Sequence, residues 1–404
     1  MALVPFRYNL RSLLVRSSST LLTVCAIGAT VAVLAGMLSL QQGFKTLFEE
    51  KGRADLAVFL RKGATSEGES GLTREQCDIL TKEVPEVQLD AAGKPLASAE
   101  LFLAVRLRKF DGGETNVAMR GIEPMTFAIH GDDIRIRDEK FTIATRDEPL
   151  HEVQGRRFTP GSDELIVGEG LVDRIANCKV GDTLRINTVT FRIVGTFTGK
   201  GGYRSEIWGD LERLSAALQR PVRSRVLAKV AQGTDLAAVQ ERYTSDLRLQ
   251  PKVQSERDYL ASQTQRLTIT FTFLGGFLAL IMGIAAIFTG TNSMLSAISA
   301  RTHEIGILKA IGYRPFAIFA SFLGEALLLG VLGGVVGCLL VLPFQGQETG
   351  TMNQTFSEAT FAFRTTPTVM IAAITFAATL GLVGGMFPAW RAARMTPTQA
   401  LRRS

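Results

Sequence analysis

The stretch from Leu267 to Ala300, LTITFTFLGGFLALIMGIAAIFTGTNSMLSAISA, contains no charged residue over 34 positions. An α-helix needs about 20 apolar residues to cross the hydrocarbon core of a bilayer, which is about 30 Å thick. At a rise of about 1.5 Å per residue, a helix of this length reaches about 50 Å, well beyond that core. The stretch therefore predicts a membrane helix that projects out of the bilayer on one side.

Three further stretches have the same character. Residues 17–44 and 365–390 carry no charge, and residues 316–347 carry one, Glu325. The first stretch has an alternative interpretation as a cleavable signal peptide, but its apolar run is longer than the usual 7–15 residues or so of such a peptide. We therefore predict four membrane helices, of which the first is an anchor.

The short flanks of these helices predict their direction, because lysine and arginine gather on the cytoplasmic side. Basic residues dominate the N-terminal flank, the loop between the second and third helices, and the C-terminal tail, whereas the loop at 345–364 has two acids and one arginine. The basic residues are Arg7, Arg11, Arg16, Arg301, Lys309, Arg314, Arg391, Arg394, Arg402 and Arg403. Both termini are expected in the cytoplasm, and residues from about 45 to 265 outside it.

Composition narrows the function classes. The net charge of +7 does not come from a Lys/Arg block with interleaved aromatic residues, so we expect no nucleic-acid partner. The four cysteines form no CxxC pair and no Cys/His cluster with zinc spacing, so no metal site is expected. A disulfide between Cys77 and Cys178 remains an alternative to two unpaired apolar residues.

The charged segment between the first two membrane helices predicts a soluble α+β domain. Alternating apolar residues predict strands, and capped periodic segments predict helices, the first of which has Thr73 and Gln76 placed for a capping box. The predicted strands are 56–60, 101–109, 116–122, 164–167, 183–186 and 191–197, and the predicted helices are 73–84, 168–177, 211–218 and 235–247. No nucleophile–base pair or phosphate-binding loop is recognisable, so the domain is expected to bind or to transmit shape changes.

Two features concern the membrane helices themselves. Small residues at four-residue spacing predict close helix packing, with the alternative that glycine is simply common in such helices. They are Gly330, Gly334, Gly337, Gly381 and Gly385. Glu325 is the one acid inside a predicted span, and a capping or coupling role is expected for it rather than ion translocation.

The loop after the second span, ARTHEIGILKAIGYRP, predicts a short amphipathic helix that ends at Gly312 and is broken at Pro315. Ile305, Leu308 and Ile311 follow one another at three-residue spacing and form its expected apolar side, with Ile307 at the flank. The expected polar side consists of Arg301, Glu304 and Lys309. An ordinary connector between two spans is the alternative interpretation.

Three motifs resemble the FtsX-like permease family, the membrane subunits of MacB-type (type VII) ABC systems such as the LolC/LolE and DevC permeases. They are ARTHEIGILKAIG with FLGEALLLG, the ending FPAWRAARMTPTQALR, and ELIVGEGLVDRI with VGDTLRI and FRIVGTF. The resemblance covers nearly the whole chain. One departure is that MacB itself carries a fused ATPase in front, whereas no GxxxxGK[ST] occurs in this sequence.

The resemblance implies a non-catalytic permease that couples ATP hydrolysis by a separate ATPase to motion of its outer domain, for export or extraction of a substrate. It implies that the inner loop contacts that ATPase, through Arg301, Glu304, Ile305, Gly306, Lys309, Ala310 and Gly312. It further implies a second permease copy or paralogue, with a periplasmic adaptor as an additional candidate partner. The expected location is the bacterial inner membrane, among its lipids, and no cofactor is expected on this chain, since ATP and Mg belong to the ATPase.

Two other functions remain as alternatives. An FtsEX-like complex would pass ATP-driven motion to a cell-wall hydrolase, although its outer domain is usually much smaller. A stand-alone receptor or adhesin would need no ATPase, and the inner-loop motif argues against it.

The predicted architecture is four transmembrane α-helices with a large extracytoplasmic α+β domain inserted between helices 1 and 2. The predicted segments are a cytoplasmic N-terminus (1–18), helix 1 (19–44), a MacB-like periplasmic core domain with stalk helices at both ends (45–265), helix 2 (266–298), a cytoplasmic coupling helix (299–315), helix 3 (316–344), an outer loop (345–364), helix 4 (365–389) and a cytoplasmic tail (390–404).

Overall fold

The computed structural model describes residues 17–48, 52–138, 140–145, 148–246, 248–352 and 358–396. They fall into two compact units. The helical unit lies within Met1–Gly43, Thr268–Gln347 and Ala362–Ser404, and the core domain lies within Phe44–Leu267 and Glu348–Phe361. Each unit has its own apolar core, so each is described by itself.

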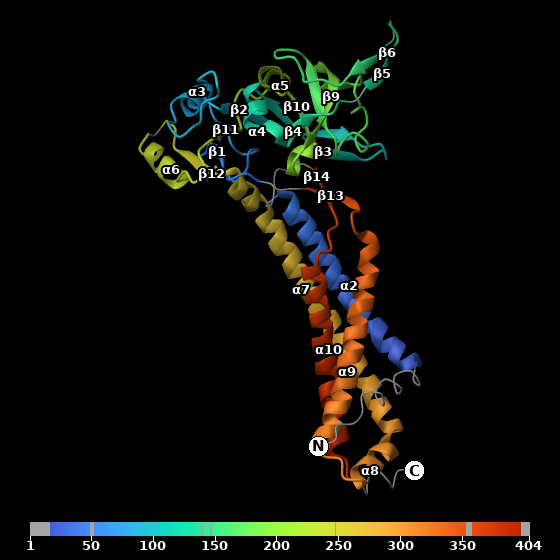
Figure 1. Ribbon diagram of the computed structural model, residues 1–404. Coiled ribbons are helices and arrows are strands. Elements are labelled where there is room, and N and C mark those ends of the chain that lie inside the picture. Colours follow the sequence, from blue (N-terminus) through green and yellow to red (C-terminus); the bar gives the residue numbers. More distant parts are fainter. Residues whose placement is uncertain are drawn as a thin grey trace. The chain divides into compact units, whose positions relative to one another are not determined.

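In the described part of the chain, four helices are long and apolar enough to cross a membrane, which confirms the predicted number (Figure 1). They are α2 (Ser17–Phe48), α7 (Glu256–Ala300), α9 (Pro315–Val341) and α10 (Pro367–Arg394). A proline stands in the first turn of α9 and of α10, where its missing N–H costs no intrahelical hydrogen bond.

Glycines set the helix packing of the helical unit. A Cβ atom built on Gly330 of α9 would lie 2.6 Å from the carbonyl oxygen of Ala377 in α10, and one built on Gly381 would lie 2.5 Å from the carbonyl oxygen of Ala326. Gly334 and Gly385 face the same interface. On another side of α9, a Cβ on Gly337 would lie 2.7 Å from the carbonyl oxygen of Gly28 in α2. Side chains at these positions would force the backbones apart.

The core domain is built on one sheet, in which ten strands of the described residues pair in the order β12-β1-β11-β2-β3-β10-β7-β9-β4, with β8 beside β9. Neighbours are antiparallel except for β3–β10 and β7–β9, which are parallel. The strands are β1 (Leu56–Arg61), β2 (Ala97–Arg108), β3 (Glu114–Ile122), β4 (Ile134–Ile136), β7 (Glu164–Gly168), β8 (Thr183–Ile186), β9 (Val189–Gly199), β10 (Glu206–Asp210), β11 (Arg225–Lys229) and β12 (Pro251–Ser255). Separate two-stranded sheets are formed by β5 (Lys140–Thr145) with β6 (Glu148–Gln154) and by β13 (Glu348–Met352) with β14 (Glu358–Ala362).

Three helices cover one face of this sheet. They are α3 (Arg74–Lys82), α5 (Leu211–Ala217) and α6 (Leu236–Thr244), and their apolar residues share a single cluster with Phe59 of β1 and Leu101 of β2. The capping box predicted for the first of them is confirmed, because Thr73 and Gln76 each bond to the other's backbone N–H. Strand β1 is buried on both faces, which explains its uninterrupted run LAVFL.

The opposite face of the sheet carries two apolar clusters instead of one. The first surrounds Leu56, Val58 and Leu60 of β1, and the second surrounds Trp208 of β10 and Phe197 of β9. The short helix α4 (Met125–His130) contributes to both, through Ile129 and Phe127 respectively. Charged side chains fill the space between the two clusters, as described below.

The predicted helix at 168–177 is wrong. Residues 169–174 form turns, and Ile175 makes a β-bridge with Lys109. The bridge and the left-handed Asn177, at φ 59°, are incompatible with continuation of a helix. Strands β10, β11 and β12 were not predicted. Each is five residues long and contains at least one charged residue, so none shows a clear apolar alternation.

Candidate functional site

The loop between α7 and α9 folds as the predicted short helix, α8 (Thr302–Ala310). Gly312 follows its C-cap at φ 103°, a left-handed conformation that favours glycine. Arg314 then serves as the N-cap of α9, and Pro315 begins that helix. The two helices are therefore separated by a tight turn that fixes where α8 ends.

One face of α8 packs inside the helical unit. Thr302, Ile305 and Gly306 are buried. Ile305 belongs to a cluster with Ile298 of α7, Ile318 and Phe322 of α9, and Ala389 and Ala392 of α10. Three of the long helices thus hold this face.

The apolar side predicted for α8 is wrong in part. Ile305 is buried, but Ile311 is 72% exposed. Six residues at about 100° each turn the helix through about 600°, so Ile311 lies far around the axis from Ile305. Ile311 instead shares a side with Ile307, four residues earlier and 42% exposed.

Two polar contacts fasten α8 at its ends. At its N-terminal end, Nη1 of Arg301 donates to Oε2 of Glu325 in α9 at 3.3 Å. At its C-terminal end, Nζ of Lys309 donates to the carbonyl oxygen of Ala393 at 2.6 Å and to that of Met395. These carbonyls end α10, where the helix dipole favours a cation. Burial lowers the pKa of Lys309.

The predicted contact residues therefore lie on different sides of α8. Arg301, Ile305 and Gly306 face into the helical unit, and Lys309 is half-buried against the end of α10. Glu304, Ala310 and Gly312 are exposed, together with His303, Ile307 and Ile311, which are not among the contact residues that the resemblance implies. We call Glu304, Ile307, Ala310 and Ile311 the outer face of α8. Ile307 and Ile311 are both exposed and lie outside the candidate spans, and we call these two residues the apolar ridge. Glu304 lies beside it.

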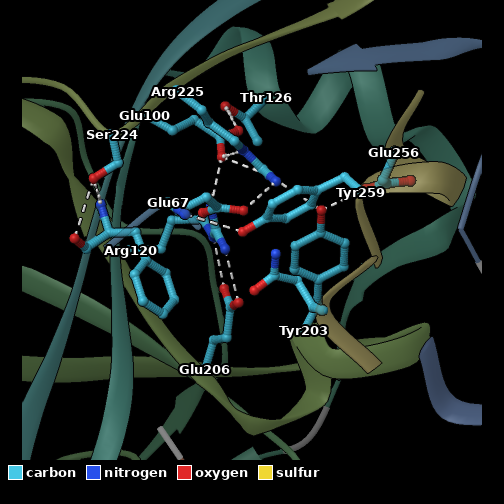
Figure 2. A network of polar contacts seen from close by, with 12 residues as sticks. Glu67, Glu100, Arg120, Thr126, Tyr203, Glu206, Ser224, Arg225, Glu256 and Tyr259 are labelled. Atoms are coloured by element: carbon cyan, nitrogen blue, oxygen red, sulfur yellow. Dashed lines mark hydrogen bonds and ion pairs between the residues drawn. The ribbon is translucent and has the colours of Figure 1, made fainter. Parts of the chain in front are cut away.

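A second polar cluster lies in the core domain, and the sequence analysis missed it (Figure 2). Arg120 of β3 donates to both carboxylate oxygens of Glu206, from Nε at 2.7 Å and from Nη2 at 2.9 Å. Its Nη1 also donates to Glu67 at 2.6 Å and to Glu100 at 3.0 Å. Arg225 of β11 donates to Glu100 at 2.8 Å and to Glu67 at 2.8 Å. We call these five residues the ionic network.

All five side chains of the ionic network are more than nine-tenths buried. Burial alone would lower the pKa of Arg120, but the carboxylates of Glu206, Glu67 and Glu100 raise it well above its ordinary value. The net result is the opposite at His130, where burial is not outweighed by carboxylates. Burial lowers the pKa of neighbouring His130 to about 3, with Arg225 and Arg120 acting in the same direction.

Little in the sequence marks the ionic network. In β2, Ser98, Glu100 and Phe102 alternate with Ala99 and Leu101, a pattern typical of a strand with one solvated face. That face is covered by segments far along the chain, which a single sequence does not reveal.

Two other kinds of site are relevant to the described residues, a metal site and a reactive or paired cysteine. Within these ranges, no group of three or more His, Cys, Asp or Glu side chains is placed to hold a metal ion. Cys77 and Cys178 are both free thiols, and burial raises the pKa of each to about 12.

Two family models match the chain. The model of the MacB-like periplasmic core domain matches residues 20–245, and that of the FtsX-like permease C-terminal region matches residues 270–397. The first alone covers more than half of the sequence. The second includes α8, Glu325 and the glycine-rich faces of α9 and α10.

The curated relatives that match this chain include MacB proteins. A macrolide export ATP-binding/permease protein MacB of Sodalis glossinidius is 28% identical over 330 residues, covering 75% of this chain and 46% of that protein. The MacB protein of Pectobacterium atrosepticum is 29% identical over 274 residues, covering 62% of this chain and 40% of that protein. The chain therefore spans about half, or less than half, of the length of these curated relatives.

Among solved structures, the periplasmic region of MacB from Actinobacillus actinomycetemcomitans aligns over 54% of this chain and 94% of that chain. The sequence identity is 14% and the TM-score 0.35, so the family assignment rests on the sequence relationships rather than on this alignment.

Proposed function

Because this chain belongs to the FtsX-like permeases that carry a MacB-like periplasmic core domain, we propose that it couples ATP hydrolysis on a separate subunit to motion of its core domain. In this proposal the chain is the non-catalytic membrane subunit of an ABC transporter complex. ATP and Mg bind to the partner ATPase, and the moving core domain exports or extracts a substrate.

The observation that carries this proposal is the two-sided placement of α8. Its inner face packs on three long helices, and both of its ends are fastened by polar contacts. A helix held in this way moves together with α9 and α10 when it is pushed. Its outer face presents two exposed isoleucines and Glu304 outside the candidate spans. Exposed apolar residues grouped on one side of a helix are typical of a protein contact.

The direction of the chain in the membrane belongs to the same proposal. Arginine-rich flanks put α8 and both termini in the cytoplasm, where an ATPase has access to ATP. The core domain then lies on the other side of the membrane. A second permease copy or a paralogue completes the complex, and a periplasmic adaptor is a further partner to be sought.

The exposure of individual side chains of α8 supports a different set of contact residues from the one that the resemblance implies. We propose that Glu304, Ile307, Ala310 and Ile311 touch the ATPase, with Gly312 ending the helix beside them. Arg301, Ile305 and Lys309 instead act from inside, because they hold α8 on the other helices.

Reconstitution tests this proposal. The full chain is purified in lipid nanodiscs with the ATPase that co-purifies with it, and ATP hydrolysis is measured with and without the chain. We expect the chain to change the hydrolysis rate, and Glu304→Lys to remove most of that change because it reverses the charge beside the apolar ridge. Glu241→Lys, the same charge reversal at an exposed position of α6 in the core domain, is the matched control. A hydrolysis rate that is the same with wild type and with Glu304→Lys would contradict the assignment of the outer face.

A further inference from the structure

The first turns of α7 carry a stripe of buried polar residues. Glu256, Tyr259 and Gln263 are spaced so that they share one side of the helix, and each is more than nine-tenths buried in the core domain. A buried polar side chain is costly unless it is hydrogen-bonded. All three form such bonds: Glu256 bonds to Tyr203 and Arg53, whereas Tyr259 and Gln263 both bond to the segment 65–67.

The contacts of the stripe are short and directional. One carboxylate oxygen of Glu256 accepts from the Tyr203 hydroxyl at 2.5 Å, and the other accepts from the backbone N–H of Arg53 at 3.1 Å. The Tyr259 hydroxyl accepts from the backbone N–H of Glu67 at 3.1 Å. Nε2 of Gln263 donates to the carbonyl oxygen of Thr65 at 2.7 Å.

These partners lead directly into the ionic network (Figure 2). Tyr203 accepts at its hydroxyl from Nη2 of Arg225 at 3.1 Å. The side chain of Glu67 accepts from both Arg120 and Arg225. Two contacts in series therefore connect α7 to Arg225 of β11 and Arg120 of β3. A third contact reaches β2 and β10, because Glu100 pairs with both arginines and Glu206 pairs with Arg120.

The segment that follows α2 meets the same turn of α7. The backbone N–H of Arg257 donates to the carbonyl oxygen of Arg53 at 3.2 Å. A Cβ atom on Gly52 would lie 2.7 Å from Cα of Arg257, so the two backbones approach as closely as glycine allows. The two connections through which the core domain is inserted are thus joined at Glu256 and Arg257.

The chemistry of this contact sets it apart from ordinary packing. Apolar surfaces tolerate small slides and rotations, whereas a set of directional hydrogen bonds fixes the rotation of a helix about its axis. Buried ion pairs generally add less stability than apolar residues of the same volume. A network of charges at this position is therefore poorly explained by stability alone.

We propose that Glu256, Tyr259 and Gln263 are positioning residues that fix α7 to the sheet, so that rotation or displacement of α7 moves the strands of the ionic network. The proposal rests on the proposed function, because it supplies the element through which ATP-driven motion reaches the core domain. α7 continues without interruption to Ala300, next to α8 in the chain.

The test uses the full chain with its ATPase in nanodiscs and measures hydrogen–deuterium exchange without nucleotide and with ATP plus vanadate. In the wild type we expect nucleotide to change the exchange of peptides from β2 and β10. In Tyr259→Phe combined with Gln263→Leu, this change should fall by about threefold or more. ATP hydrolysis should persist, because neither residue lies in the ATPase contact. Tyr243→Phe is the matched control, since this hydroxyl of α6 donates to the carbonyl oxygen of Glu83, at the C-terminal end of α3.

The outcomes separate the two proposals. A wild type whose core domain shows no nucleotide-dependent exchange contradicts the proposed function itself. A wild type that shows the change, with a double variant that keeps all of it, overturns the positioning role and leaves the proposed function standing. If the double variant unfolds, Glu256→Gln replaces it. That substitution keeps an acceptor for Tyr203 and loses only the bond from the Arg53 N–H, and the same two outcomes then decide.

Discussion

Arg301 and Glu325 form a nearly buried ion pair, with Nη1 of Arg301 lying 3.3 Å from Oε2 of Glu325 and both side chains about nine-tenths buried. The pair joins the start of α8 to α9, so it places the outer face of α8 relative to a membrane helix. Removing Glu325 leaves Arg301 with the more distant and exposed Glu304, at 3.9 Å, and removing Arg301 takes away the cation beside Glu325. Breaking a buried pair by removing one partner costs about 3–5 kcal/mol, whereas removing both takes away the two buried charges together.

A double-mutant cycle tests the pair. We expect Arg301→Met and Glu325→Met each to lower the thermal stability of the full chain in micelles and the stimulation of the ATPase, and the double variant to recover most of both. The matched control is Arg391→Met, which changes an exposed arginine in the last turn of α10. Additive losses in the double variant would show that the two residues do not act on each other.

Lys309 fixes the other end of α8. Its ammonium group donates to the carbonyl oxygens of Ala393 and Met395, which end α10. Lys309→Met keeps the stem but removes these charge-assisted bonds, each worth about 1.5–3 kcal/mol. We expect faster hydrogen exchange in residues 390–396 and weaker ATPase stimulation. Arg391→Met, which changes an exposed cation in the last turn of α10, should leave both unchanged. Equal effects of the two substitutions would contradict a specific role for Lys309.

Packing of α9 on α10 depends on glycine. A Cβ on Gly381 would meet the backbone of Ala326 at 2.5 Å, whereas one on Gly324 of α9 would meet nothing within 4 Å. We expect Gly381→Ala to destabilise the helical unit by about 1–3 kcal/mol, because the two backbones must separate. Gly324→Ala should be neutral or slightly stabilising, since alanine favours a helix more than glycine does. The readout is the temperature at which half of the protein remains monodisperse in micelles, and a Gly381→Ala protein that melts with the wild type would argue against close packing there.

His130 gives the core domain a defined pH dependence. Its pKa in the folded state is about 3, because of burial and the charges of Arg225, Arg120 and Arg53, against about 6.5 in an unfolded chain. Between these values the unfolded state binds one more proton, so the folded state loses stability as the pH falls. From pH 7 to pH 5 this loss amounts to about 2 kcal/mol.

Replacing the imidazole should remove that loss. We expect His130→Phe to show a flatter dependence of unfolding on pH than the wild type between pH 7 and pH 5. Trp208 lies in the same aromatic group as His130, so its fluorescence in a Trp390→Phe background reports unfolding of the core domain alone. Parallel pH profiles of the two proteins would show that His130 is not the responsible group.

The sequence alone predicted the parts of the fold that one strong physical rule controls. A bilayer demands a long apolar run, so four spans were readable, and a capping box has a local signature, as at Thr73 and Gln76. Strands of five residues such as Glu206–Asp210 escaped prediction because charge interrupts their pattern. Their charged residues lie inside because segments distant in sequence cover them.

In the candidate site, too, features with a local sequence signal were predicted, whereas features decided by contacts with distant segments were not. The inner loop was recognisable from its motif, and the short helix was predictable from Gly312 and Pro315. Which side of α8 is free was not predictable, because the buried side is decided by contacts of Ile305 with α7, α9 and α10. Arg301 and Lys309 look like surface cations in the sequence, yet both have partners within the helical unit.

The most direct test of the coupling assignment is photo-crosslinking from the outer face of α8. The photoreactive residue p-benzoylphenylalanine is placed at Ile311 in the full chain expressed with its ATPase, and at Leu89, an exposed position of the core domain, as the control. The account predicts a crosslinked product from position 311 that contains an ATPase with a GxxxxGK[ST] motif, and none of that product from position 89. Absence of the ATPase from the product at position 311, in cells where the two proteins co-purify, would contradict it.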